Sequence, residues 1–284
     1  MNNWILLMII DAFVISFSEV FKKKALEKNS IFEISAFFTG IAFIINIFFS
    51  KDALWIGYTY LPIILLKSII IVATWLIGIK AIKELQLSIY GIIKVSRIVF
   101  TTLLSCLFLG ESFSYTTLIG MIIVIIGLIL VNITNKNDAV KKKNSINIVI
   151  LFLISCLGSA VSAIIDKKIL LHITISQLQF WFYFFLTIFF FIILFLKEKK
   201  IDIKIVKNNY WIILISICLV ISDRLLFIVN ANSSSQVIIM TILKQLSIVI
   251  SIIMGKFIFK EKDIFKKLLW SIFIIMGVAI MIIF

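Results

Sequence analysis

Ten long apolar segments follow one another along the chain, separated by short polar connections. Each is 17 to 23 residues long, which is the length that an α-helix needs to cross the hydrocarbon core of a bilayer. A helix is favoured there because it satisfies its own backbone hydrogen bonds. The pattern predicts an all-α integral membrane protein with ten transmembrane helices, at residues 4–20, 32–50, 61–79, 86–108, 114–133, 146–165, 175–196, 210–229, 236–258 and 268–284.

The segments fall into two halves that resemble each other in sequence. A shift of 150 positions lays residues 81–134 over 231–284, and 13 of these 54 pairs are identical. Many matches are isoleucine on isoleucine, which carries little weight in an isoleucine-rich chain. Four are more informative: Gln86/Gln236, Lys94/Lys244, Glu111/Glu261 and Gly127/Gly277. We therefore expect a duplicated five-helix unit, with a first repeat at 1–134, a cytoplasmic linker at 135–145 and a second repeat at 146–284.

A second match, at a shift of 144 positions, lays residues 21–26 over 165–170. A unit of five helices crosses the membrane an odd number of times, so its second copy must enter the membrane upside down. The sequence thus predicts an inverted repeat of two five-helix halves. This arrangement is typical of transporters that have a substrate site near the bilayer midplane and work by alternating access.

Lysines are distributed unevenly over the predicted connections. The odd-numbered connections, starting with the one between the first and second segments, carry 20 lysines when Lys256, near the end of the ninth segment, is counted with the connection that follows it, and the even-numbered connections carry 3. Cytoplasmic loops of membrane proteins carry an excess of Lys and Arg. We therefore expect the odd-numbered connections to lie in the cytoplasm and both chain termini to lie outside, in a bacterial cytoplasmic membrane.

Composition supports a membrane protein and excludes several other classes. Hydrophobic residues make up 62% of the chain, against about 45–50% in soluble domains, and the mean hydropathy is +1.20. The net charge of +14 does not indicate nucleic-acid binding, because the lysines are explained as helix anchors. Cys106, Cys156 and Cys218 lie inside apolar runs without paired spacing. The sequence has no hydrolytic triad, nucleotide-binding loop or metal-ligand cluster, so we predict no enzymatic activity, no cofactor and no metal site.

Two helix-end motifs link the chain to a known family. The tripeptide at 109–111 ends in Glu111 and is followed by a glycine-bearing apolar segment, and the tripeptide at 259–261 ends in Glu261 and is followed by a segment with Gly277. We interpret both glutamates as structural. With the helix number and the duplication, these motifs make the chain similar to the EamA-type branch of the drug/metabolite transporter superfamily over essentially its whole length.

The resemblance implies a central cavity lined mainly by helices 1, 3, 4, 6, 8 and 9, with helices 5 and 10 at the periphery. Members of this family move small metabolites, often amino acids, and more distant relatives carry nucleotide sugars or phosphorylated sugars. Members often have a proline in helix 4 or 9, but neither segment has one here, so a proline kink cannot be the hinge. Many members keep their termini in the cytoplasm, whereas the lysines of this chain predict the reverse.

Ionisable side chains inside the predicted helices are the candidates for a substrate site. A charge at a helix centre costs about 2.5–3.5 kcal/mol on insertion scales, so such residues should face a cavity or a partner. Arg97 lies at the centre of the fourth segment, Lys94 is on the same face one turn away, and Lys244 has the matching place in the ninth. Arg and Lys suit carboxylate or phosphate groups. We predict that they hold an anionic group; the alternative is internal ion pairing with Asp11 or Asp223.

Three further residues are assigned less specific roles. Asp223 and Arg224 are adjacent in the eighth segment, so their side chains diverge by about 100°. We expect one to face the cavity and the other to face a neighbouring helix. Asp11, midway along the first segment, is a candidate proton site, a candidate partner for a substrate amine, or the counter-ion of a buried cation.

Aromatic residues and charges near helix ends complete the set. Trp75 and Tyr90 are candidates to line the cavity, although aromatic residues in membrane helices more often pack or anchor the helix at the interface. Glu19 and Lys67 lie nearer helix ends, and we expect their side chains to reach the interface.

The predicted function follows from the balance of charges within the helices. A secondary transporter for a small organic anion or zwitterion, such as an amino acid or a phosphorylated metabolite, is favoured, with protons as a candidate coupling ion. The alternatives are a flippase for a polyprenyl-phosphate-linked sugar and a non-transporting scaffold, in which unpaired mid-membrane charges would have no use. A monomer and a homodimer both fit. Apart from Glu33 and Lys256, which lie near the ends of their segments, the balance is five basic residues against three acidic ones: Lys67, Lys94, Arg97, Arg224 and Lys244 against Asp11, Glu19 and Asp223.

Overall fold

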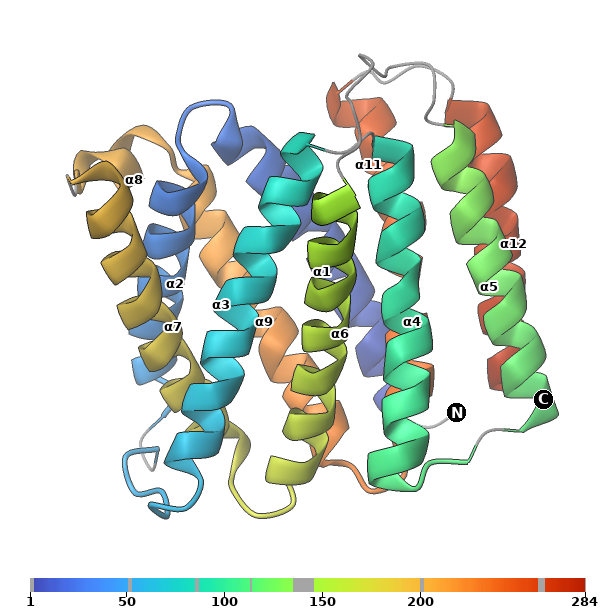
Figure 1. The fold of residues 1–284 in the computed structure, drawn as a ribbon, viewed down its shortest axis with the longest axis horizontal. Coiled ribbons are helices and arrows are strands. Elements are labelled where there is room, and N and C mark those ends of the chain that lie inside the picture. Colours follow the sequence, from blue (N-terminus) through green and yellow to red (C-terminus); the bar gives the residue numbers. More distant parts are fainter. Residues whose placement is uncertain are drawn as a thin grey trace.

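The computed structural model describes residues 3–50, 53–84, 87–112, 114–134, 146–199, 202–259 and 264–283. Within these ranges the chain forms a bundle of twelve α-helices and no β-strand (Figure 1). In chain order the helices are α1 (Asn3–Leu26), α2 (Ile31–Ile47), α3 (Leu61–Glu84), α4 (Leu87–Leu109), α5 (Tyr115–Thr134), α6 (Ile146–Ile169), α7 (Ile175–Glu198), α8 (Lys204–Asn208), α9 (Trp211–Ala231), α10 (Val237–Leu243), α11 (Leu246–Phe259) and α12 (Ile264–Ile283).

The helices agree with an all-α membrane protein. Among the described residues, seven helical stretches are long and apolar enough to cross a membrane: α1, α3, α6, α7, α9, the joined stretch Val237–Met254 of α10 and α11, and α12. The helices α2 and α5 are shorter apolar helices. Nine of the ten predicted segments each overlap one helix and the ninth overlaps both α10 and α11, while the short helix α8 falls in the polar stretch 197–209, which was predicted as a connection.

The outer surface of the bundle is apolar. On α1, for example, Leu6, Ile10, Phe13 and Phe17 are all exposed, and their spacing of three and four residues places them on one face of the helix. Apolar stripes of this kind are unfavourable in water and suit contact with lipid tails.

Local signals in the sequence fix several helix ends. Ser30 caps α2 and Thr174 caps α7, each in a reciprocal capping box with the Glu or Gln three residues later, which satisfies backbone N–H groups that the first turn leaves unpaired. At the far end of α4, Gly110 adopts a left-handed conformation with φ of 65°. Glycine has no Cβ to clash there, so it ends the helix without strain.

The predicted ninth segment, 236–258, is not one continuous helix, because it breaks at Lys244 and Gln245 between α10 and α11. The backbone N–H of Gln245 donates to the carbonyl of Ile242 at 2.9 Å. The carbonyl of Thr241, its ordinary helical partner, instead accepts from the side-chain Nε2 of Gln245 at 2.9 Å. A side chain that enters the backbone ladder in this way interrupts a helix, so the break needs no proline.

Helices that are distant in sequence lie side by side (Figure 1). The helices α5 and α12 form one edge of the bundle, and α2 and α7 form the other. Between them α1 packs on α9, and both α3 and α4 pack on α6. The backbones of α5 and α12 touch, since a Cβ added at Gly277 would lie 2.6 Å from the carbonyl oxygen of Gly120.

Different helix termini lie at the two ends of the bundle. The helix α1 begins and α12 ends at the same end, the lower one in Figure 1, where α4 also ends and α5 begins. The helix α5 ends and α6 begins at the opposite end. We call the lower end the terminus end and the upper end the linker end.

Candidate functional site

A buried acid on α1 meets a lysine at the α10–α11 break. Asp11 is fully buried, and its Oδ1 accepts a hydrogen bond of 2.5 Å from the Oγ of Ser222 on α9. The Nζ of Lys244 lies 3.6 Å from Oδ2 of Asp11, and Oδ2 has no hydrogen-bond partner among the described residues. This is the internal ion pair that the sequence offered as the alternative to substrate binding, and it joins three helices.

The neighbouring residues Asp223 and Arg224 on α9 reach different partners. The hydroxyl of Tyr183, which is fully buried on α7, donates to Oδ2 of Asp223 at 2.8 Å. Arg224 Nη1 donates to the Oγ of Ser176 at 3.2 Å and to the Oε1 of Gln179 at 3.4 Å. The two side chains therefore diverge as their adjacency predicted, but both reach α7, about one to two turns apart.

Lys67 does not reach the interface, so that prediction was wrong. Its side chain on α3 is 2% exposed, and its Nζ lies 2.5 Å from Oδ1 of Asp166 on α6. The same Nζ lies 3.7 Å from the ring centroid of Phe182 and 4.8 Å from that of Phe227. The partner was missed because the sixth segment was ended at residue 165, whereas α6 continues to Ile169 and holds Asp166 inside the bundle.

Arg97 and Lys94 lie on α4 with different environments. The Nε of Arg97 is buried and has no hydrogen-bond partner within the described part of the chain, and Lys94 is exposed. Lys94 is seven residues from the start of α4 and Lys244 is seven residues from the start of α10, which begins at the opposite end of the bundle. The two lysines are thus each about 10 Å from the end of the bundle where their own helix begins. Because these ends are opposite, the lysines do not lie at the same depth in the bundle.

Lys22 is one of the lysines of the first predicted connection, and its side chain points to aromatic residues of neighbouring helices. Its Nζ lies 5.7 Å from the ring centroids of both Phe38 on α2 and Trp75 on α3. Trp75 is half-buried and stacks on Phe190, with ring centroids 5.8 Å apart. The predicted cavity residue Trp75 therefore packs between helices beside a cation. The side chain of Tyr90 lies outside the described residues.

The ionisable groups form one cluster around Asp223. This carboxylate interacts electrostatically with Lys67, Lys244 and Asp11, and also with Lys22. Acidic and basic groups thus alternate through the interior of the bundle. Such an arrangement can bind a ligand that carries one charge of each sign. Its acidic and basic side chains can also exchange ion-pair partners when helices move. No group of His, Cys, Asp and Glu suited to a metal ion occurs among the described residues.

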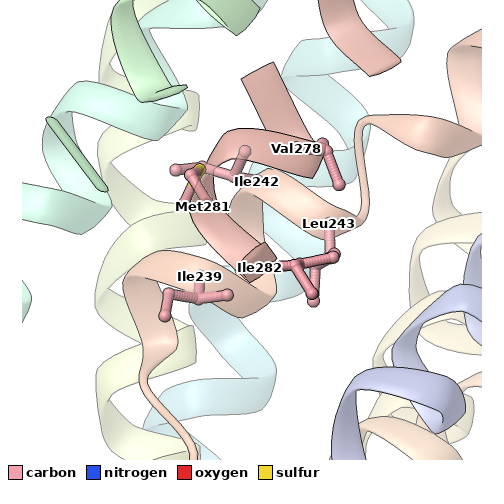
Figure 2. Close-up of a pocket in the computed structure, with 6 residues that line it drawn as sticks. All are labelled: Ile239, Ile242, Leu243, Val278, Met281 and Ile282. Carbon is pink, nitrogen blue, oxygen red and sulfur yellow. The ribbon is translucent and has the colours of Figure 1, made fainter. Parts of the chain in front are cut away.

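A small pocket of the structure has no polar lining. Figure 2 shows it between α10 and α12. Without a polar group it offers nothing to orient a charged ligand, so we do not assign the substrate site to it. Its lining consists of Ile239, Ile242, Leu243, Val278, Met281 and Ile282.

Glu111 has the structural role that was predicted, and it joins the two halves of the chain. Its Oε1 accepts from the backbone N–H of Val237 at 2.7 Å, and its Oε2 accepts from that of Ile238 at 3.2 Å. These are unpaired N–H groups of the first turn of α10, where a negative charge is favourable. Glu261, its partner in the repeat, lies outside the described residues.

The comparisons with known proteins agree on the fold and the family. A model of the EamA-like transporter family matches residues 2–133 and, a second time, residues 146–283. One similar solved structure, described only as "Crystal structure of protein", superposes with a TM-score of 0.80 over 99% of this chain and 96% of its own, at 10% identity. At that identity the likeness shows a shared fold. No curated protein matches the chain.

Proposed function

The chain belongs to the EamA-like transporter family, and we propose that it is a secondary transporter for a small organic anion or zwitterion, an amino acid or a phosphorylated metabolite, in the bacterial cytoplasmic membrane. The observation that carries the substrate class is the cluster of buried and half-buried ionisable groups around Asp223. Charges are retained in membrane helices when they have a partner or a function. Here they are gathered between helices of both halves.

An inverted repeat with ten membrane crossings is part of this proposal. The family model matches twice, once on each half, and equivalent helices have equivalent neighbours: α1 packs on α9 as α6 packs on α3. At the shift of 144 positions, Asp11 corresponds to Ser155. Asp11 bonds to Ser222 of α9, and Ser155 donates to the carbonyl of Thr74 of α3 at 3.0 Å. Corresponding positions on α1 and α6 therefore contact the corresponding helices α9 and α3, which supports the symmetry.

We assign the anionic group of the substrate to Arg97 with Lys94 and Lys244. Arg97 is about 18 Å from the end of α4 at the terminus end, close to the middle of the helix, and its Nε lacks a partner among the described residues. A guanidinium in that state is suited to a carboxylate or a phosphate. For a zwitterion, Asp223 supplies the negative charge for an amine, since it is engaged by a neutral hydroxyl.

The α10–α11 break supports alternating access. Discontinuous helices with charged residues at the break are a recurrent feature of transporter sites, and here the break carries Lys244. Because Lys244 also pairs with Asp11, movement at the break changes the charge environment of both residues. Asp11 is accordingly the candidate for the coupling proton.

Ligand binding to the purified protein tests this function. Amino acids, phosphorylated sugars and a polyprenyl phosphate are screened by thermal shift, where a ligand at 100 times its Kd stabilises by about 2.7 kcal/mol. A compound that stabilises is then assayed for uptake into proteoliposomes. We expect an amino acid or a phosphorylated metabolite to bind and be taken up. Stabilisation by polyprenyl phosphate alone would point to the flippase instead.

Substitutions then test the residues. We expect Arg97→Gln and Lys244→Gln to abolish binding of that compound while the variants still fold, because Gln keeps polarity and removes the charge. Lys24→Gln is the matched control, since Lys24 forms a partly exposed pair with Glu27 at 3.3 Å near the end of α1. Wild-type transport in both Arg97→Gln and Lys244→Gln would contradict the assignment of the anion to these residues.

A further inference from the structure

We propose that the ion pair Lys67–Asp166, enclosed by Phe182 and Phe227, is the gate that closes the substrate pathway at the terminus end of the bundle. It must separate in each transport cycle. This inference rests on the proposed transport function, because a protein without a pathway needs no gate. It concerns residues that have no place in the assigned binding set.

The position of the pair on the terminus-end side of the charged cluster, to which Lys67 belongs, supports a gate. Lys67 is the seventh residue of α3, and Asp166 lies three residues before the end of α6. With a rise of 1.5 Å per residue, they are about 9 Å and about 5 Å from the terminus end, where α3 begins and α6 ends (Figure 1). Asp11 and Asp223 are each about 12 Å from that end, so the pair lies outside them.

The pair also joins the two halves of the chain. Lys67 belongs to the first half and Asp166 to the second, and the residues are 2% and 4% exposed. A buried ion pair is a poor way to gain stability, because removing both charges from water costs about as much as their attraction returns. The pair instead holds α3 and α6 in one closed arrangement. In it, Nζ of Lys67 lies 2.5 Å from Oδ1 of Asp166, and the rings of Phe182 and Phe227 exclude water from the lysine.

The cluster offers alternative partners when the pair opens. Asp223 interacts electrostatically with Lys67, and Lys244 interacts with Asp166. Each member of the pair can therefore transfer to a residue of opposite charge without being left alone in the membrane. A pair that can exchange partners in this way can open repeatedly. An isolated buried pair would stay closed, because its separated charges would have no other partner.

A second link between the halves lies at the same end. Glu111, at the end of the first-half helix α4, accepts from the first two N–H groups of the second-half helix α10. Within the second half, Lys167 donates to the Oγ of Ser235 at 2.6 Å and so ties α6 to the segment that precedes α10. The residue next to Asp166 is thus connected to the helix that Glu111 caps, and the terminus end closes as a unit.

Labelling of a cysteine placed behind the pair tests the gate. Ser162 is one turn deeper than Asp166 on the same face of α6 and is 4% exposed, so Ser162→Cys is a conservative reporter. The three native cysteines are first replaced by serine or alanine. A membrane-impermeant maleimide is then added to intact cells or to oriented vesicles on the side of the chain termini, and the labelling rate is measured.

We expect slow labelling with the native pair and labelling that is faster by about tenfold or more with Lys67→Gln. The charge reversal Lys67→Asp with Asp166→Lys should return the rate toward that of the native pair. Lys24→Gln, which breaks the Lys24–Glu27 pair near the end of α1, should leave it unchanged. If Lys67→Gln does not fold, Lys67→Gln combined with Asp166→Asn removes both charges and should also label faster.

An unchanged labelling rate in a folded variant without the pair would overturn the gate. The measurement does not depend on knowing the substrate or on transport. Faster labelling in a protein that moves none of the screened compounds would therefore uphold the gate and count against the proposed substrate class alone.

Discussion

The Nζ of Lys244 lies 3.6 Å from Oδ2 of Asp11, and Lys244 itself stands at the break between α10 and α11. Asp11 is fully buried, whereas 20% of the Lys244 side chain is exposed. The carboxylate is fixed from the other side by the hydroxyl of Ser222. The lysine is therefore the more accessible partner, and an anion that competes for it would leave the buried negative charge of Asp11 without its counter-ion.

Asp11→Asn should destabilise the protein, because it leaves the charge of Lys244 uncompensated in the bundle. Asn still accepts a hydrogen bond from Ser222, so the packing is kept. Combining Asp11→Asn with Lys244→Gln should recover part of the loss. We expect a coupling free energy of about 1–3 kcal/mol in the double-mutant cycle, at the lower end because the lysine is partly exposed. Unfolding of the purified variants measures it, and additive effects would show that the two residues do not interact.

Gln245→Leu should slow transport without loss of stability. The substitution removes the amide that occupies the carbonyl of Thr241, so the backbone N–H at 245 can take that carbonyl and α10 and α11 can join. The backbone hydrogen bond that replaces the side-chain bond would favour the continuous helix over the broken one by about 1 kcal/mol. A transport cycle that needs the broken helix would then be about fivefold slower. The matched control is Gln236→Leu, which removes a bond of 3.3 Å to the carbonyl of Ser112 outside the break. Equal transport rates for the two variants would exclude a role for the break.

Gly277→Ala should weaken the packing of α5 on α12. The added Cβ would lie 2.6 Å from the carbonyl oxygen of Gly120, and overpacking of this kind typically costs about 1–3 kcal/mol. Gly78→Ala is the control, because the nearest atom to its Cβ would be 3.9 Å away, an ordinary contact. Thermal unfolding in detergent compares them, and a Gly277→Ala variant as stable as Gly78→Ala would refute the close approach of these helices.

Both chain termini should face the outside of the cell. The lysine-rich connections motivate this prediction, and the structure brings α1 and α12 to the same end of the bundle. Alkaline phosphatase fused after Phe284 should be active, and a fluorescent protein at the same site should be dark. Bright fluorescence with inactive phosphatase would show that the termini face the cytoplasm. The proposed gate would then lie on the cytoplasmic side.

The sequence by itself determined where most of the helices lie, that the chain has two similar halves, and most of the charged residues that lie inside the bundle. Lipid imposes a uniform requirement for apolar residues over a fixed length, so a membrane helix can be located without knowing its neighbours. For the same reason Asp11, Arg97 and Lys244 stand out, since an ionisable residue in an apolar run is exceptional wherever the helix packs.

Only the tertiary structure decided which charges meet. Lys67 and Asp166 are 99 positions apart, and no local pattern on either helix records that α3 packs on α6. The α10–α11 break was equally hidden, because the Gln245 side chain competes for a carbonyl of its own helix without any proline or glycine to mark the place. Ion pairs and helix breaks depend on directions and on distances of a few ångströms, and these are fixed only when the helices have packed.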